Sequence, residues 1–383
     1  TFRLDDCRDE VVQICQLVDG LPLGIVIAAG WTRYLAPKEI LSMLRENFLG
    51  VKPIHEDMPI RHQGFENLLQ SMVAYLSAEE THALTRLSIF KGSFDHNAAL
   101  HIANIDQLEF VKLIDKSLIQ RSENFRYTIH NVVRQVFEAR LVESGEIDDV
   151  MRQYTQYYAN WCKDLLEHTP TLADQLNAIY IEYHNIVRTE HLSTEQKQRY
   201  VLEIAPAMVT LWLGRNDNIK SIVSILSAGS VNVDIPSEIR ASALNALAKI
   251  YLQMSDYDAV TVASEQALQL EKSLDMPIIR AIALRNLCEV NTILADFDKA
   301  QHYLHEILAI ESHMNTPVAP PLQLIFVAAY AQLGTIAMER AEYDTARQYL
   351  QTAVRQSLDL GDELRAAFGK NNLGIIALKE GKY

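Results

Sequence analysis

Two histidines and a glutamate in the C-terminal half have the spacing of a metal site. His302 and His305 are three residues apart in a helical pattern, and Glu306 follows directly. One helix face could therefore offer two imidazoles and a carboxylate to a metal ion. Solvated helix faces carry such residues far more often than metal sites do. We therefore expect an exposed surface here and no metal ligands.

The sequence shows no other arrangement that supports catalysis. It contains no G-x-S-x-G elbow, no G-x-x-x-x-G-K-[ST] phosphate loop, and no apolar strand that ends in paired acidic residues. Its four cysteines, Cys7, Cys15, Cys162 and Cys288, form no C-x-x-C pair, which argues against a zinc site or a redox dithiol. We predict that the chain is not an enzyme, that it has no catalytic residues, and that its cysteines are reduced, buried thiols.

The composition is that of a helical, water-soluble protein. The 383 residues include only 14 Gly and 11 Pro, too few for the tight turns of a β-sandwich. We find no apolar run that approaches the roughly 18 residues of a membrane span, and we expect a cytoplasmic protein without membrane contact. A net charge of −14 argues against non-specific binding to nucleic-acid phosphates. The chain starts at Thr1 and ends inside a helical hairpin, so we expect a piece of a longer protein.

The C-terminal part of the sequence repeats itself. A short pattern of a small residue, a polar residue and an aromatic residue occurs four times. The aromatic residues of the four copies are Tyr257, Phe297, Tyr343 and Tyr383. Subtracting their numbers gives spacings of 40, 46 and 40. A Leu followed by a small residue recurs ten residues upstream of each, at Leu247-Ala248, Leu287-Cys288, Leu333-Gly334 and Leu373-Gly374. Small residues let a neighbouring helix approach closely. We predict helical hairpins whose turn aromatics pack into the core.

These residues resemble the tetratricopeptide repeat, whose consensus places Leu-Gly before the turn, Gly-Asp-Tyr in it and Ala after it. Val260 and Ile307 stand at Ala sites, and the period exceeds the usual 34. The resemblance covers residues 236–383 as three repeats and a truncated fourth. It implies a concave face that binds a protein partner or an inducer, with the contacting residues unknown.

The middle region, residues 148–235, reads as helical hairpins that link the repeats to the N-terminal part. An aromatic stripe of Tyr154, Tyr157, Tyr158 and Trp161 is predicted to be core. The stretch Glu182-x-x-Asn185-Ile186, followed by Leu211-Trp212-Leu213, resembles the junction of bacterial signalling ATPases that carry tetratricopeptide arrays.

Capping signals divide residues 76–147 into short elements. Ser77 with Glu80 has the spacing of a capping box, and Asp95 and Asp106 can cap two further helices. The third helix would carry Leu108, Val111 and Ile114 on one face. A β-hairpin over residues 118–129 and a final helix over 130–142 follow. Three helices, a hairpin and a closing helix predict a winged-helix domain.

The N-terminal motifs resemble STAND-type signalling ATPases of bacterial transcriptional-regulator type. The resembling segments are Leu87-Ser-Ile-Phe90-Lys-Gly92, Leu113-Ile-Asp115-Lys-Ser117-Leu118, Ile129-His130-Asn131, and Gly20-Leu21-Pro22-Leu23, which matches the GLPL motif of the family. The resemblance identifies residues 1–75 as the C-terminal helical part of an NB-ARC-like ATPase module. We expect a mainly α fold: a helical subdomain and a winged-helix domain, then an α-α superhelix of tetratricopeptide-like repeats.

The resemblance also implies a nucleotide-dependent function. Pro22 would lie against the base of the nucleotide, and His130, at the place of the Met-His-Asp motif of the family, would reach the β-phosphate of ADP in the resting state. Asn131 departs from the usual Asp. The parent protein would bind ADP or ATP through a missing ATPase core, and this piece would be its regulatory and sensor portion.

Two alternatives remain from the sequence alone. One is a tetratricopeptide scaffold for protein–protein interaction that has no link to nucleotide. The other is a DNA-binding winged-helix regulator, in which Lys112, Lys116, Arg121 and Arg126 would place positive charge near the third helix and the wing. We expect direct DNA binding by this chain to be absent.

Overall fold

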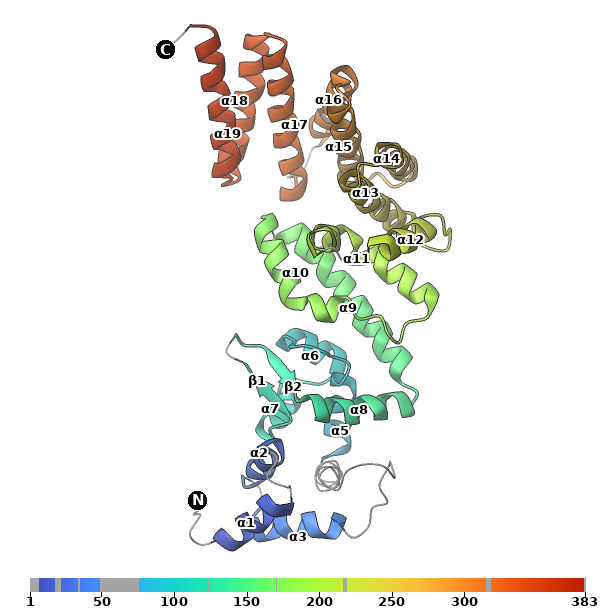
Figure 1. The fold of residues 1–383 in the computed structure, drawn as a ribbon, viewed down its shortest axis with the longest axis vertical. Coiled ribbons are helices and arrows are strands. Elements are labelled where there is room, and N and C mark those ends of the chain that lie inside the picture. The colour runs from blue at the N-terminus through green and yellow to red at the C-terminus, as the bar shows by residue number, and fades with distance from the viewer. Residues whose placement is uncertain are drawn as a thin grey trace. The chain divides into compact units, whose positions relative to one another are not determined.

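The chain folds almost entirely into helices (Figure 1). The computed structural model describes residues 7–17, 22–33, 35–48, 76–122, 124–169, 171–215, 219–314 and 318–381. Within these ranges, eighteen helices are accompanied by two short strands. The prediction of a mainly α fold that ends in helical repeats is confirmed.

Three helices open the chain: α1 (Arg8–Leu17), α2 (Pro22–Trp31) and α3 (Pro37–Phe48). Trp31, Ile40 and Leu44 are almost fully buried among them. Gly20 and Leu21 of the Gly-Leu-Pro-Leu motif, and residues 49–75 of the predicted N-terminal helical part, lie outside the described ranges.

The next elements follow in the predicted order and will be called the α5–α8 module. They are α5 (Ala78–Leu87), α6 (His96–Ala103), α7 (Gln107–Asp115), β1 (Ile119–Arg121), β2 (Tyr127–Ile129) and α8 (Asn131–Glu143). All three predicted caps are confirmed. Ser77 Oγ accepts a hydrogen bond from Glu80 N (3.2 Å), Asp95 Oδ1 from Ala98 N (2.7 Å) and Asp106 Oδ1 from Glu109 N (2.9 Å).

The hairpin is antiparallel, and its register pairs Ile119 with Ile129. Phe94 forms an additional bridge to Tyr127, and its ring stacks on Phe90 with centroids 4.4 Å apart. Phe90, Phe94 and Phe110 are fully buried, so the core of the module lies between its helices and the hairpin.

The predicted face of α7 is wrong. Leu108 and Val111 are 65% and 40% exposed, whereas Phe110 and Leu113 are completely buried. The larger Phe110 meets the Tyr127 ring edge-on at 4.8 Å, so this aromatic contact with the hairpin decides which face of the helix turns inward.

Long helices follow the module. They are α9 (Ile147–His168), α10 (Leu172–Ile186), α11 (Thr194–Arg215) and α12 (Ile219–Ser230).

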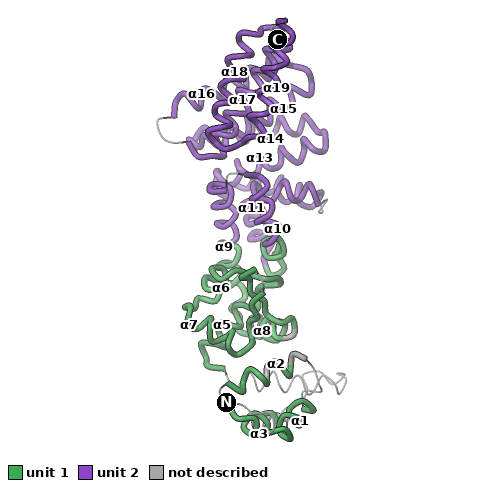
Figure 2. The backbone as a smooth tube through the Cα atoms, turned by 90° about the vertical axis from the view of Figure 1, so that its left-hand side faces the viewer, with its two compact units in different colours: residues 1–157, 182–191 green, residues 158–181, 192–383 purple. Residues whose placement is uncertain are grey.

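Contacts divide the chain into unit 1, residues 1–157 and 182–191, and unit 2, residues 158–181 and 192–383, which Figure 2 shows in green and purple. Tyr154 and Tyr158 of the aromatic stripe are fully buried, as predicted, while Tyr157 and Trp161 are half-buried.

Consecutive helix pairs form the repeats of unit 2. Their helices are α13 (Ser237–Gln253), α14 (Tyr257–Glu271), α15 (Pro277–Ile293), α16 (Phe297–His313), α17 (Pro320–Glu339), α18 (Tyr343–Asp359) and α19 (Glu363–Lys379). The small residues Ala248, Cys288 and Gly334 are buried at the helix contacts as predicted, and Val260 and Ile307 are buried too. The prediction is wrong for Gly374, which is exposed because nothing packs within 4 Å of a Cβ at its position. The turn residues Ser255, Ala295 and Ala341 share a left-handed backbone with φ near 60°, as Gly381 does with φ 71°.

The predicted core position of the turn aromatics is wrong for Phe297. This residue begins α16, and its side chain is 46% exposed because it lies at the end of the hairpin, where the helix faces no longer meet. Tyr257 and Tyr343, which begin α14 and α18, are half-buried.

The expectation that no apolar run approaches the length of a membrane span is wrong for helix α17. Its 20 residues, with mean hydropathy 1.4, are long and apolar enough to cross a membrane by length and composition. More than half of the apolar window, 56%, is buried inside the protein. Leu322, Phe326 and Leu333 belong to the core that α17 shares with α15 and α16, so its apolar composition fills the interior of the repeats.

Candidate functional site

His130 lies between β2 and α8. The buried Ile129 fixes the chain on one side, and on the other the His130 carbonyl accepts the hydrogen bond of Arg134 N (2.9 Å), which starts the helix. The imidazole is exposed. An imidazole N–H at a helix start adds a donor to the partial positive charge of the first backbone N–H groups. This arrangement suits contact with an anion.

Pro22 is the first residue of α2, and its side chain lies outside the described part of the structure. The other end of α2 packs on the turn between α7 and β1. A Cβ on Gly30 would come 3.0 Å from Ser117 Oγ, and Arg33 Nη1 lies 3.2 Å from Asp115 Oδ1. The structure therefore connects the helix of Pro22 to the α5–α8 module.

Helix α8 is anchored one and two turns after its start by a charged cluster. Arg134 donates to Asn131 Oδ1 (2.8 Å) and to Glu138 Oε2 (2.5 Å). Glu138 Oε1 in turn accepts a hydrogen bond from Arg188 Nη2 at 2.5 Å. The Arg188 side chain is 0% exposed and therefore has no access to water. The position of α8, and with it that of His130, therefore depends on Arg188, which lies 50 positions after Glu138 in the chain.

The charge state of Glu138 reflects this cluster. Burial of the carboxyl acts to raise its pKa, but the charges and hydrogen bonds of Arg188 and Arg134 outweigh that effect and lower the pKa below its ordinary value. Glu138 is therefore a carboxylate near neutral pH, which is the form that Arg188 requires as its partner.

A second set of polar contacts joins the hairpin to the last turn of α10. Arg126 forms an ion pair with Glu182, and its guanidinium donates to Ser93 Oγ (2.8 Å) and Ser93 O (2.6 Å). Asn185 Nδ2 donates to Ser93 O (2.8 Å) and to Glu182 Oε2 (2.9 Å). These groups are largely buried, so each depends on the others for its hydrogen bonds.

Further contacts complete the attachment of segment 182–191. Tyr154 O–H donates to Asn185 O (2.9 Å), Lys91 pairs with Glu190, and Arg188 Nε lies 3.8 Å from Glu190 Oε2. We call this segment, with its partners Ser93, Arg126 and Glu138, the α10 clasp. All of it belongs to unit 1.

The sequence had indicated only part of the α10 clasp. Glu182, Asn185 and Ile186 were singled out as a junction, and they are buried. Arg188 and Glu138 were missed, because an Arg that folds into the interior looks like any surface Arg in a sequence. Arg126 was assigned to a positive surface on the wing. That assignment is wrong, because the Arg126 guanidinium contacts Glu182 and Ser93 and the side chain is 15% exposed.

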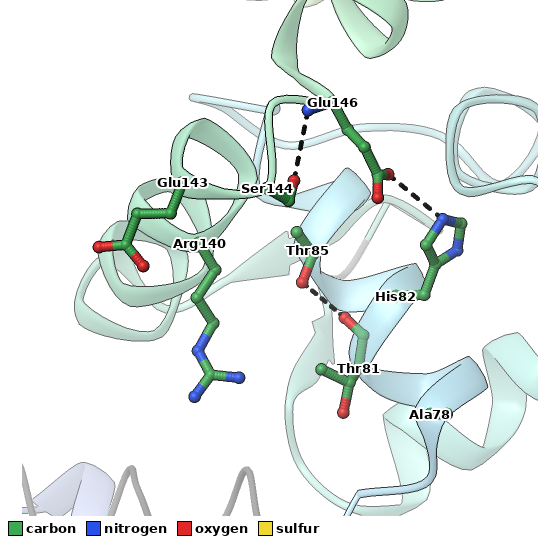
Figure 3. A pocket seen from close by; sticks show the side chains of 8 residues that line it. All are labelled: Ala78, Thr81, His82, Thr85, Arg140, Glu143, Ser144 and Glu146. Carbon is green, nitrogen blue, oxygen red and sulfur yellow. Dashed lines mark hydrogen bonds and ion pairs between the residues drawn. The ribbon is translucent and has the colours of Figure 1, made fainter.

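A shallow pocket lies at the other end of α8 (Figure 3). Its lining comes from α5, the end of α8 and the following turn, and includes Thr81, His82, Arg140 and Glu146. His82 Nε2 lies 3.5 Å from Glu146 Oε2 across it. Since α8 has 13 residues and rises about 1.5 Å per residue, this pocket is separate from His130.

The metal candidates of the chain are surface groups. His302 and Glu306 form an exposed pair at 3.4 Å, and His305 Nε2 faces Tyr349 O–H at 3.5 Å. Among the residues that the structure describes, Asp164, Glu167 and His168 at the end of α9 bring their ligand atoms within 4.8 Å of one another, and all three residues are exposed.

The four cysteines differ in burial. Cys162 and Cys288 are buried as predicted, whereas Cys7 and Cys15 are partly exposed. Burial raises the pKa of the Cys162 thiol to about 12, so this thiol is unreactive at neutral pH.

Comparison with known proteins gives relatives of limited coverage. No protein-family model matches the chain. A stretch of 163 residues, 40% of the chain, is 34% identical to an uncharacterized protein of Mycobacterium tuberculosis and covers 42% of it. A stretch of 298 residues, 71% of the chain, is 26% identical to a protein of the same organism that is named provisionally as an HTH-type transcriptional regulator, and covers 33% of it. The chain thus spans less than half the length of these relatives.

A solved structure from an archaeon matches nearly the whole chain. It is the crystal structure of a signal transduction ATPase with numerous domains (STAND protein) with a tetratricopeptide repeat sensor, from Pyrococcus horikoshii. The match covers 94% of this chain and 57% of that chain, with a TM-score of 0.52 and 13% identity. This chain therefore has the fold of part of a STAND protein with a tetratricopeptide repeat sensor, and it has distant relatives named as transcriptional regulators.

Proposed function

We propose that this chain is the regulatory and sensor portion of a STAND-type signal-transduction ATPase that controls transcription. The observation that carries this proposal is the fold shared with a STAND protein over 94% of the chain. Residues 1–75 would complete the ATPase module, 76–147 would form its winged-helix domain, 148–235 would link it to the repeats, and 236–383 would be the tetratricopeptide sensor.

In the resting state, ADP would be held between the missing ATPase core and the α5–α8 module. The exposed His130, at the start of α8, would donate a hydrogen bond to the β-phosphate, and Pro22 would lie against the base. The ATPase core would supply the phosphate loop and the magnesium ligand, which this sequence lacks.

The α10 clasp gives the sensor a route to this nucleotide contact. Arg188 holds Glu138 on α8, two turns after His130, and the chain continues from residue 191 directly into unit 2. An inducer or protein partner that binds the repeats would favour one arrangement of this segment. It would thereby shift the parent between a closed, ADP-bound form and an open, ATP-bound form.

Substitution of His130 in the full-length parent tests the nucleotide contact. A hydrogen bond to a charged group contributes about 1.5–3 kcal/mol, so His130→Ala should weaken ADP binding about 10- to 100-fold. Basal transcription from a reporter should rise, and less ADP should remain on the purified protein.

The control is His82→Ala, which removes an exposed imidazole in the same unit but in the pocket of Figure 3. It should change neither readout. Unaltered ADP retention and basal transcription in a folded His130→Ala parent would contradict the proposed contact.

The direct DNA-binding alternative is less favoured by the structure. Arg126 pairs with Glu182, and Lys116 Nζ lies 2.6 Å from Glu80 Oε2 with 14% of its side chain exposed. Two of the four cations proposed for a DNA surface are thus engaged in ion pairs within unit 1. A gel shift with the chain alone, compared with a Lys112→Glu variant, tests this alternative.

A further inference from the structure

The turns that join α13 to α14, α15 to α16 and α17 to α18 have the same backbone. In each turn the residue after the C-cap has a left-handed conformation with φ of 59° or 60°. The C-cap residues are Met254, Leu294 and Arg340. Since the backbones match, these three side chains occupy equivalent positions, and only their chemistry differs.

The first two of these turns expose apolar side chains. Met254 is 54% exposed and Leu294 is 59% exposed, and the second turn adds Ile293 (50%) and Phe297 (46%). The third turn has the charged Arg340 at the C-cap instead. Exposed apolar groups that gather in one place and are rimmed by polar residues mark interaction surfaces.

The first two turns lie next to each other. The first helices of their repeats, α13 and α15, pack along each other, because Asn286 Nδ2 donates to Asn245 O at 3.4 Å. The C-cap residues follow these two asparagines by eight and nine positions, respectively. Packed helices lie about 8–10 Å apart, so Met254 and Leu294 are separated by about the length of two turns of an α-helix.

Carboxylates surround the apolar side chains. In the first turn Asp258 is exposed and has no ion-pair partner in the parts of the chain that the structure describes. In the second turn Asp296 pairs with Lys299 (2.9 Å). Asp298 pairs with Arg340 of the third turn (2.5 Å), yet its side chain is 89% exposed. The rim is therefore predominantly acidic.

We propose that Met254, Leu294 and Phe297, with Asp258 and Asp298 at their rim, form a docking surface for a basic amphipathic helix of a partner protein. We call this surface the turn edge. The inference rests on the proposed sensor function, because it names the class of protein that the repeats take up. Two successive turns of such a helix cover Met254 and Leu294 with apolar side chains, and its Lys or Arg side chains reach the carboxylates. The apolar contacts supply affinity, and the charges reject acidic partners.

Peptide binding to the 383-residue chain tests this proposal. The probe is a fluorescein-labelled helical peptide with Leu on one face and Lys on the other. A scrambled peptide of the same composition has no apolar face, and a third peptide has Glu in place of Lys. Fluorescence anisotropy should show the tightest binding for the probe.

Two variants locate the binding on the turn edge. Leu294→Ser should weaken binding of the probe about tenfold, because one leucine is lost from the apolar contact. Asp258→Asn should weaken it about threefold, since a charge at the rim contributes less.

Leu358→Ser and Asp344→Asn are the matched controls. Leu358 is 48% exposed at the far end of α18, and Asp344 has the place in the third turn that Asp258 has in the first. Neither control should change the affinity. All four substituted side chains are exposed, so each variant should unfold thermally as the original chain does.

Absence of saturable binding, equal affinity for the probe and either comparison peptide, or unchanged affinity after Leu294→Ser would each overturn the proposal. Sedimentation of the chain alone identifies a different occupant: a dimer that Leu294→Ser dissociates would reassign the turn edge to a second copy of this chain, and would also overturn the proposal. The assay needs no nucleotide, so its failure leaves the His130 experiment in the parent as an independent test of the proposed function.

Discussion

The α10 clasp and the repeats are stabilised by different interactions. In the clasp, a fully buried Arg188 and the buried Glu182 meet charged partners from elements 50 or more residues earlier. In the repeats, close contacts between neighbouring helices are made by small residues such as Ala300, Gly334 and Ala346 against Leu and Ile.

This difference bears on how each region can move. Apolar helix contacts tolerate small shifts, because they have no direction. A buried ion pair must keep its geometry, since a charge that loses its partner in the interior is costly. We therefore expect the clasp to change between discrete arrangements and the repeats to bend gradually.

Breaking the clasp should give the largest effect on stability. Arg188→Ala leaves Glu138 without its buried partner, and we expect unit 1 to lose about 3–5 kcal/mol, measured by urea unfolding. The comparison is Lys299→Ala in the repeats, whose ion pair with Asp296 (2.9 Å) is exposed. That change should cost far less, because water screens an exposed ion pair. Similar losses in both variants would contradict the contrast between the two regions.

Adding one methyl group tests the close packing of the repeats. A Cβ at Gly334 would lie 2.6 Å from Leu350 Cγ, so we expect Gly334→Ala to cost about 1–3 kcal/mol. Gly374, at the equivalent position of the next repeat, meets nothing within 4 Å. Gly374→Ala should instead stabilise its helix by about 0.5–1 kcal/mol. Calorimetric unfolding measures the predicted loss of stability in Gly334→Ala and the predicted gain in Gly374→Ala. A change of the same sign in both variants would disprove the tight contact at Gly334.

The smallest expected effect is a pH dependence from Glu138. Its folded pKa is lowered, so its contribution to stability is present above the unfolded pKa of about 4.3 and is lost as the pH falls through the folded value. The stability difference between the original chain and Glu138→Gln should therefore shrink between pH 6 and pH 3, measured by urea midpoints. A constant difference for Glu138→Gln would refute the ion-pair explanation.

Local features of the fold could be predicted from the sequence. The caps at Ser77, Asp95 and Asp106 depend on groups three residues apart, and the hairpin depends on neighbouring strands. The repeats were found because their turns recur in register, although Phe297 is more exposed than expected. Signals of this kind lie within a short stretch of chain, so one sequence contains them completely.

Features that join distant elements could not be predicted. The pairing of Arg126 with Glu182 and of Arg188 with Glu138 depends on how whole elements pack, and nothing in the local sequence marks these arginines as buried. The inner face of α7 was misjudged for a related reason, because Phe110 is selected by its contact with Tyr127 of the hairpin. Candidate site residues show the same limit: His130 was placed at a helix start, but its ligand remains a proposal.

The apolar character of α17 has a consequence for biosynthesis. Its face at Gly334 and Ala337 is covered by Ala346 and Leu350 of α18, a helix that ends 20 residues after α17 does. At about 5–20 residues per second, the ribosome needs roughly one to four seconds to synthesise the residues that complete α18. During this interval a helix with the length and composition of a membrane span is only partly shielded, so its uncovered face exposes the nascent chain to aggregation.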